Sequence, residues 1–139
     1  MRILGLDVGE KTIGVAVSDE LGLTAQGLTV IRRTSKVADR QALQGIVGTC
    51  GADGLVVGLP RNMDGSLGPK ARQVQRFAGE VLKPLGLPIE YYDERLTTVS
   101  AQRTLLEGDV SRAKRRLVVD QLAAALILQG YLDRRRAQG

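Results

Sequence analysis

The chain has 139 residues, 43% of them apolar, and this length and composition predict one globular domain over residues 1–139 with a substantial core. It has no histidine or tryptophan, one phenylalanine and three tyrosines, which excludes histidine-based catalysis and disfavours an aromatic base-stacking platform. Cys50 is the only cysteine, so no disulfide forms within the chain. With no signal-peptide pattern and no apolar run of membrane-spanning length, we expect a cytoplasmic protein without a membrane partner.

The positive charge is concentrated toward the end of the sequence. The net charge is +5, and residues 101–139 carry eight Lys and Arg residues against four acidic ones. An uneven distribution of this kind favours binding to a phosphate backbone. A solvated helix face followed by a tail would show the same pattern. The basic residues form two clusters, Arg112, Lys114, Arg115 and Arg116, and Arg134–Arg136.

Three strands are predicted in the first part of the chain, at about 2–8, 12–18 and 25–32. The links between them are short, and links of this length predict an antiparallel meander. Ser35 is a suitable N-cap for a helix that continues to about Cys50.

Helices and strands alternate in the remainder of the chain. Each later strand returns through a helix, which predicts strands parallel to the first one. The predicted fold class is therefore α/β, with a mixed five-stranded sheet, three antiparallel strands then two parallel ones, flanked by helices. The remaining predicted elements are a strand at 54–58, a helix at 69–82, a strand at 88–92, a helix capped by Thr97 or Thr98 that runs to Leu106, a mobile segment at 108–116, and a helix at 117–132.

Three acidic residues stand at the ends of these elements. Asp7 ends the first strand, Glu94 follows the fifth, and Asp120 lies in the first turn of the last helix. We expect them to converge, because ligands of open α/β sheets bind at the carboxyl ends of the strands. Clustered carboxylates in a chain without histidine predict a site for Mg²⁺ or Mn²⁺, where the metal takes the place of a histidine base in phosphodiester hydrolysis.

Each of these acids also has a structural explanation. Asp7 could cap a turn, Glu94 could pair with Arg95, and Asp120 could favour a helix N-terminus electrostatically. Asp93 could assist Glu94 or replace it.

The first hairpin contains Gly9 and Gly14 with Lys11 at its tip, a pattern that suggests a phosphate-cradling turn. Turn geometry and close packing explain the two glycines equally well.

Four blocks of sequence, in this order, resemble a known family: 4–9 with 13–19, 57–60 with 62–65, 93–98, and 120–124 with 127–132. On these motifs the chain resembles, over essentially its whole length, the YqgF (RuvX) family of pre-16S rRNA nucleases, which are Holliday junction resolvase-like. The resemblance implies a ribonuclease H-like fold and metal-dependent cleavage by Asp7, Glu94 and Asp120 as catalytic acids and metal ligands. Classical resolvases carry an acid at the end of the fourth strand, whereas this chain has Gly58-Leu59-Pro60, so that role moves to Glu94.

The leading hypothesis is a metal-dependent endonuclease that processes the 5′ end of pre-16S rRNA in ribosome biogenesis. The alternatives are a Holliday junction resolvase acting on DNA and a non-catalytic nucleic-acid-binding assembly factor. The sequence leaves open the cleavage position, the preferred metal and the choice between a monomer and a homodimer. Contacts to nucleic acid are predicted from Lys11, Arg61, Asn62, Arg95, Arg112, Lys114, Arg115 and Arg116.

Overall fold

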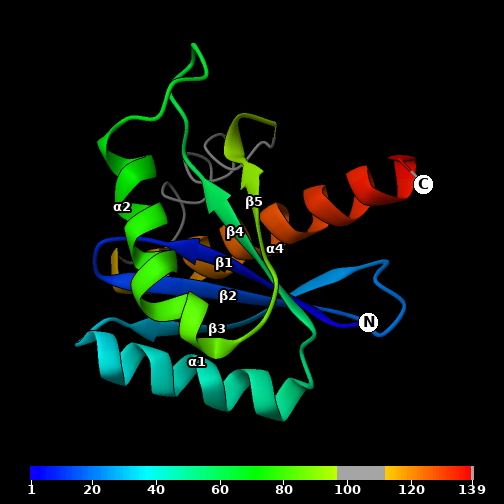
Figure 1. Ribbon diagram of the computed structural model, residues 1–139, viewed down its shortest axis with the longest axis horizontal. Coiled ribbons are helices and arrows are strands. Elements are labelled where there is room, and N and C mark those ends of the chain that lie inside the picture. Colours follow the sequence, from blue (N-terminus) through cyan, green and yellow to red (C-terminus); the bar gives the residue numbers. More distant parts are fainter. Residues whose placement is uncertain (97–111, 139) are drawn as a thin grey trace.

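The computed structural model describes the backbone of residues 1–96 and 112–138 and the side chains of 1–96 and 119–138. At its centre is a five-stranded sheet with the strand order β3-β2-β1-β4-β5 (Figure 1). The predicted mixed α/β sheet is therefore confirmed. In the described ranges, no helix is both long and apolar enough to cross a lipid bilayer.

The first three strands form the predicted antiparallel meander. They are β1 (Ile3–Val8), β2 (Thr12–Ser18) and β3 (Ala25–Arg32). The backbone N–H of Gly9 donates to the carbonyl oxygen of Thr12 over 2.9 Å and closes the first turn. In the resulting register Asp7 lies opposite Gly14.

The last two strands run parallel to β1, as predicted. β4 (Gly54–Leu59) pairs with β1, with Leu6 beside Val57, and β5 (Ile89–Asp93) pairs with β4. The carboxyl ends of β1, β4 and β5 consequently lie at one edge of the sheet, which is where the sequence places Asp7 and Glu94.

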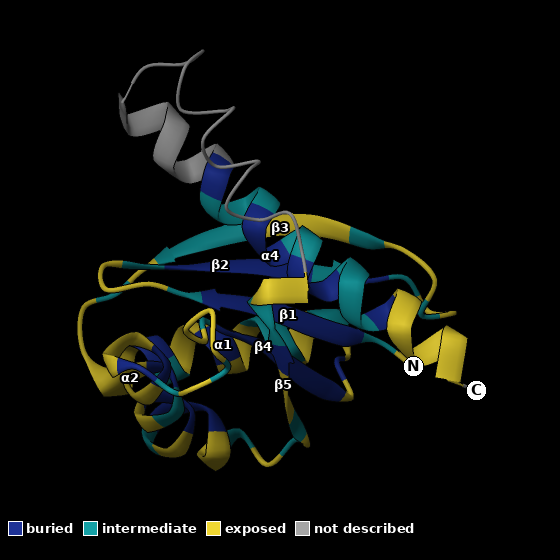
Figure 2. Ribbon diagram, turned by 90° about the horizontal axis from the view of Figure 1, so that it is seen from above, coloured by how far each residue is buried: buried dark blue, intermediate teal, exposed yellow. Residues whose placement is uncertain are grey.

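Helices cover both faces of the sheet (Figures 1 and 2). On one face lie α1 (Lys36–Cys50) and α2 (Pro69–Phe77), and on the other lies α4 (Arg112–Gln138). The Oγ of Ser35 accepts a hydrogen bond from the N–H of Ala38 over 3.1 Å, which confirms the predicted cap of α1.

The core is divided by the sheet into two parts, because successive side chains of a strand point to opposite faces. Leu4 and Leu6 of β1 pack toward α1 and α2, whereas Ile3 of the same strand packs toward α4. Every residue of β4 is buried, as expected for a strand covered on both faces.

Two boundaries differ from the prediction. The helix predicted at 69–82 is α-helical only to Phe77, and continues as a π-helical turn, η1 (Ala78–Leu82), and a 3₁₀ turn, η2 (Lys83–Leu85). Pro84 lacks the N–H that an α-helix would need there. The last helix begins at Arg112 and not at residue 117, so residues 112–116 of the segment predicted to be mobile belong to α4. Arg, Ala and Lys are all strong helix formers. Residues 108–111 and the predicted helix from Thr97 or Thr98 to Leu106 lie outside the described residues.

Glycines in the sheet allow α4 to pack very close to it. A Cβ atom at Gly14 would lie 2.2 Å from the carbonyl oxygen of Asp120, and one at Gly5 would lie 2.6 Å from the Cβ of Leu128. Atoms do not approach this closely, so only glycine permits the observed spacing between β1, β2 and α4.

This spacing predicts that Gly14→Ala destabilises the protein by roughly 1–3 kcal/mol, because the added methyl group overpacks a rigid contact with backbone atoms. Urea unfolding measures the change. Gly45→Ala in α1 is the matched control, since a Cβ there meets nothing within 4 Å and alanine favours a helix. Equal stability of Gly14→Ala and wild type would contradict the contact between β2 and α4.

Candidate active site

Asp7 stands near the end of the central strand, on the face that α4 covers. It lies two residues from Gly5 and four from Ile3, both of which face α4, so alternation along β1 places its side chain there too. Only 9% of its surface is exposed. Burying a carboxylate is costly unless hydrogen bonds or positive charge compensate it. The position is therefore unlike that of an ordinary solvated acid.

Asp120 approaches Asp7 from α4. Thr12, the first residue of β2, donates its hydroxyl to Oδ2 of Asp120 over 2.6 Å. The backbone of Asp120 lies directly over Gly14, which is the register partner of Asp7. Asp120 is thus held against the sheet by a side-chain hydrogen bond and by close backbone packing.

The placement of Asp120 within its helix differs from the prediction. The sequence predicts Asp120 in the first turn, but α4 begins at Arg112 and Asp120 lies two turns inside it. The favourable effect of a helix N-terminus on an acid fades beyond the first turn. A helix-terminus role for Asp120 is therefore wrong.

Glu94 lies on the same face of the sheet as Asp120, but over β4, whereas Asp120 lies over β2. It begins a 3₁₀ turn, η3 (Glu94–Leu96), directly after β5. Its Oε1 lies 3.0 Å from the point where a Cβ of Gly58 would stand. Gly58 follows Val57, the β4 neighbour of Leu6 in β1. Gly58, near the end of the fourth strand, thus leaves room for the carboxylate of Glu94.

These contacts bring the elements of the three predicted acids to one edge of the sheet. Asp7 is central, Asp120 lies over β2, and Glu94 lies over β4. Their oxygen donors suit a hard cation such as Mg²⁺ or Mn²⁺. In the part of the chain with described side chains, however, no three acidic, histidine or cysteine side chains form a group able to hold a metal ion.

Asp93 is engaged by Arg95. The Arg95 guanidinium donates from Nη2 to Oδ2 of Asp93 over 2.7 Å and from Nε to both oxygens, and its Nη1 donates to the carbonyl oxygen of Met63. The hydrogen bonds from Arg95 hold the pKa of the Asp93 carboxyl below its usual value. Arg95 thereby ties the end of β5 to the loop after β4.

Two further predicted nucleic-acid contacts, Arg61 and Asn62, lie in that loop. Arg61 is exposed, and its Nη1 donates to the carbonyl oxygen of Gly65 over 3.0 Å. Asn62 donates from Nδ2 to Oγ of Ser66 over 3.0 Å. The loop is therefore organised by its own side chains beside the candidate site.

The other predicted contacts are more widely spread. Lys11 is exposed at the tip of the β1–β2 hairpin. The backbone of the cluster Arg112, Lys114, Arg115 and Arg116 lies in the first turns of α4, while its side chains lie outside the described ones.

Sequence reasoning missed the roles of Thr12 and Gly58. Thr12 is separated from Asp120 by 108 residues, and no local pattern announces their hydrogen bond. Gly58 was recognised only as the absence of an acid. Its lack of a side chain, near the end of a buried apolar strand, is the available signal that another group occupies the space.

The sheet order, with helices on both faces, defines a ribonuclease H-like domain of the type found in junction resolvases. The structure is similar to T. thermophilus RuvC in complex with a Holliday junction substrate, with a TM-score of 0.61 at 19% identity over 100% of this chain and 98% of that one. It is also similar to the fowlpox virus Holliday junction resolvase, with a TM-score of 0.55 at 12% identity over 96% and 99% of the two chains. At these identities the similarity establishes the fold alone.

The chain belongs to the RuvX family, whose model is described as Holliday junction resolvase and matches residues 1–134. A relative from Moorella thermoacetica is 63% identical over 134 residues, covering 96% of each chain. One from Heliobacterium modesticaldum is 58% identical over 133 residues, covering 96% of this chain and 89% of the relative. Both relatives carry the description "Putative pre-16S rRNA nuclease".

The Asp93–Arg95 pair predicts a pH-dependent contribution to stability. The pKa of Asp93 is lowered from 3.8 in the folded protein. The pair therefore contributes fully above pH 3.8, and the contribution is lost as the pH falls through the lowered value. The difference in melting temperature between wild type and Asp93→Asn should be present at neutral pH and shrink below pH 3.8.

Calorimetry across this pH range measures the difference. Asp133→Asn is the control, because the pair between Asp133 and Arg136 is about half exposed and should matter less. A difference for Asp93→Asn that does not change with pH would contradict a stabilising ion pair.

Proposed function

We propose that this chain is a divalent-metal-dependent endonuclease that processes the 5′ end of pre-16S rRNA. The observation that carries the proposal is the arrangement around Asp7, with Asp120 held against β2 by Thr12 and Glu94 lying over Gly58. The descriptions of relatives that are 58–63% identical support the RNA substrate.

Each acid has a defined part in this proposal. Asp7, Glu94 and Asp120 would hold Mg²⁺ or Mn²⁺, and the bound metal would supply an activated water and stabilise the leaving oxygen. Thr12 would orient the carboxylate of Asp120 through its hydroxyl. The rigid backbone contact at Gly14 would keep α4, and with it Asp120, from moving away from Asp7. Binding of the cation would draw the three carboxylates together and offset their mutual repulsion.

The basic residues have a separate part. Lys11, Arg61, Arg95 and the cluster in the first turns of α4 would contact phosphates and position the substrate without selecting its sequence. Cleavage of a phosphodiester bond would then depend on the acids, and affinity would depend on the arginines and lysines.

A second candidate is cleavage of a four-way DNA junction. It is favoured by the description of the family model and by the fold shared with RuvC. Against it stands the end of the fourth strand, Gly58-Leu59-Pro60, which has no acid where classical resolvases carry one. Parallel assays of the purified protein on precursor 16S rRNA and on a four-way junction, with Mg²⁺ or Mn²⁺, separate the two. Tight binding without cleavage of either substrate would instead support a non-catalytic assembly factor.

Asp7→Asn should lower the rate of hydrolysis at least about 10²-fold, because it removes a charge that would hold the metal while keeping the side-chain shape. Its folding should survive, since one repulsive charge is lost. Single-turnover cleavage with saturating protein measures the rate. Glu94→Gln should behave similarly, and the two losses should not add.

Glu20→Gln is the matched control for Glu94→Gln. Glu20 is an exposed acid that pairs with Arg2, away from the candidate site. The Glu20→Gln variant should cleave at the wild-type rate. Wild-type activity in Asp7→Asn would eliminate the proposed mechanism.

Metal binding should also appear without any substrate. Ions that bind only the folded site stabilise it, so the melting temperature of wild type should rise with Mn²⁺ concentration. A triple variant, Asp7→Asn, Glu94→Gln and Asp120→Asn, should show no such rise. Scanning fluorimetry measures both melting temperatures. Equal shifts in the two proteins would place the ion elsewhere.

A further inference from the structure

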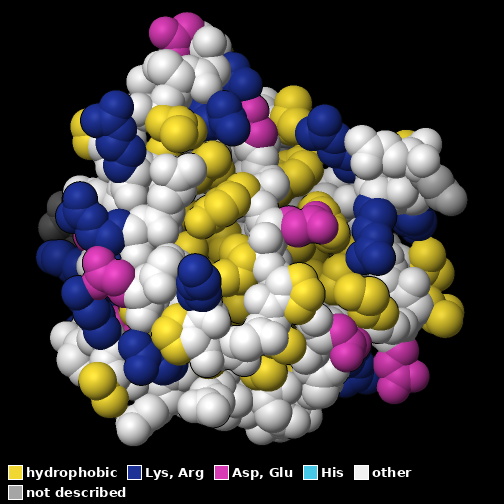
Figure 3. All heavy atoms as spheres, in the orientation of Figure 1, with side chains coloured by type: hydrophobic (Ala, Val, Ile, Leu, Met, Phe, Trp, Pro, Cys, Tyr) yellow, Lys and Arg dark blue, Asp and Glu magenta, His cyan; other side chains and the backbone are white. Residues whose placement is uncertain are grey.

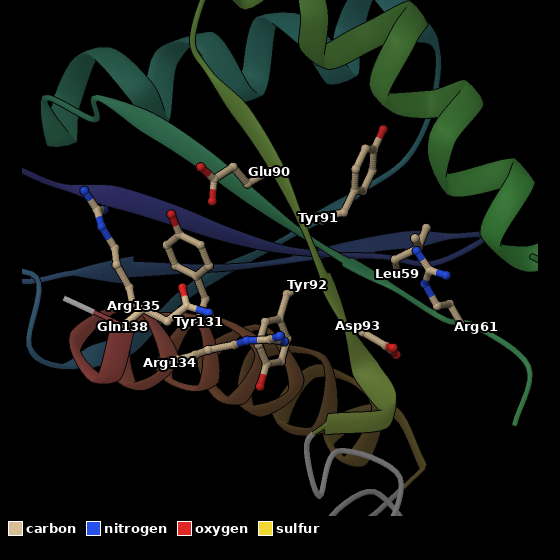
Figure 4. Close-up of a pocket in the computed structure, with 10 residues that line it drawn as sticks. All are labelled: Leu59, Arg61, Glu90, Tyr91, Tyr92, Asp93, Tyr131, Arg134, Arg135 and Gln138. Carbon is tan, nitrogen blue, oxygen red and sulfur yellow. The ribbon is translucent and has the colours of Figure 1, made fainter. Parts of the chain in front are cut away.

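A cleft of about 510 Å³ lies along β5, the outermost strand on one side of the sheet (Figure 4). Its lining includes all three tyrosines of the chain, although the third follows the first by 40 residues in sequence. Three arginines from two different elements line the same cleft. These six residues are Tyr91, Tyr92, Tyr131, Arg61, Arg134 and Arg135.

The cleft begins beside the candidate active site, although none of the three acids lines it. Leu59 and Asp93 line it, and they are register partners at the carboxyl ends of β4 and β5. Glu94, a proposed catalytic acid, follows Asp93 directly. In the close-up, Asp93 and Arg61 lie at one end of the labelled group, while Tyr131 and Arg135 of α4 lie at the other (Figure 4). A strand leaving the candidate site along β5 would therefore pass through the cleft.

The tyrosines differ in accessibility. Tyr92 is buried, and its hydroxyl lies against Gly130 of α4, so it forms part of the packed wall. Tyr91 is 41% exposed, and Tyr131 is partly exposed. The ring of Tyr91 points to the opposite side of β5 from Tyr92 and Tyr131, so a ligand that reaches both exposed rings crosses this edge strand (Figure 4). Base–aromatic stacking is tolerant of sequence, because every base has a π-face.

The charges of the cleft suit an anion. Arg61, Arg134 and Arg135 are all exposed. Of the two acids in the wall, Asp93 is paired with Arg95, and Glu90 is exposed beside the Tyr131 hydroxyl, so the three arginines outnumber the acids. Burial raises the pKa of the Tyr131 hydroxyl, and the neighbouring carboxylate of Glu90 raises it further. In the space-filling view, hydrophobic side chains cover the region of β4 and β5, and basic side chains lie around its margin (Figure 3).

We propose that this cleft binds a single-stranded segment of nucleic acid that continues from the cleaved phosphate. Bases stack on Tyr91 and Tyr131, and Arg61, Arg134 and Arg135 contact the backbone phosphates. This inference rests on the proposed nuclease function and specifies its substrate as one with an unpaired extension. A cleft of this volume holds about one or two nucleotides.

The first test is binding without catalysis. A labelled oligouridylate of about ten nucleotides is titrated in EDTA, by fluorescence anisotropy at several salt concentrations, against wild type and the double variant Arg134→Gln, Arg135→Gln. The variant should bind more weakly, and the slope of log affinity against log salt should fall by about 0.7 for each lost single-strand contact. A parallel titration with oligothymidylate shows whether the cleft distinguishes RNA from DNA.

The matched control is the double variant Arg72→Gln, Arg76→Gln. It removes the same charge from the exposed side of α2, on the opposite face of the sheet from α4. Its affinity and salt slope should stay close to those of wild type. Equal losses in the two double variants would overturn the proposal, because they would show attraction by net charge alone.

The second test concerns stacking. Tyr91→Leu should weaken oligouridylate binding at least about fivefold, whereas Tyr91→Phe, which keeps the ring, should bind within about twofold of wild type. Unchanged binding by Tyr91→Leu would overturn the proposal and leave the cleft as a sheet edge protected by charge. Melting temperatures confirm that each variant is folded.

A cleavage assay separates this inference from the proposed function. On a substrate with a single-stranded extension, the Arg134 and Arg135 double variant should raise KM and leave kcat unchanged. On a blunt substrate it should match wild type. A wild-type protein that binds the oligonucleotide through the cleft but cleaves nothing would overturn the nuclease proposal alone.

Discussion

The contact on which the candidate site depends is the close approach of α4 to the sheet. Side chains normally keep a helix well away from a sheet, but the backbone of Asp120 lies directly against Gly14, and the Cβ of Leu128 lies directly against Gly5. This spacing lets Thr12 reach the carboxylate of Asp120. It also makes the position of Asp120 rigid, because backbone atoms cannot adjust as a long side chain can. The geometry of the site is thus a consequence of packing.

The buried carboxylate of Asp7 on the central strand has an energetic cost. Parallel strands end together, so β1, β4 and β5 deliver Asp7, Gly58 and Glu94 to one edge. Gly58 supplies the volume that the carboxylate of Glu94 occupies. Gathering negative charge here opposes folding unless a cation or ordered donors answer it. Natural proteins accept such costs at functional sites, which is why this edge stands out from the rest of the sheet.

Arg95 connects this edge to its surroundings. Its guanidinium is pre-organised for two parallel hydrogen bonds, and it joins Asp93 at the end of β5 to the loop that contains Arg61. The loop is therefore held beside both the acids and the tyrosine-lined cleft. A substrate that binds the cleft and the acids together would meet side chains that are already in position, which reduces the entropic cost of binding.

The sequence by itself determined the strands, their parallel or antiparallel sense, the cap at Ser35 and the three acids, because hydrophobic period, link length and turn residues act over a few neighbours. It also carried the family motifs. Only the tertiary structure decided that α4 begins at Arg112, that Thr12 holds Asp120, and that Glu94 lies over Gly58. It alone brought the three tyrosines, scarce in the composition, into one cleft. These features join residues far apart in the chain, and their distances follow from how α4 packs on the sheet, which no local pattern encodes.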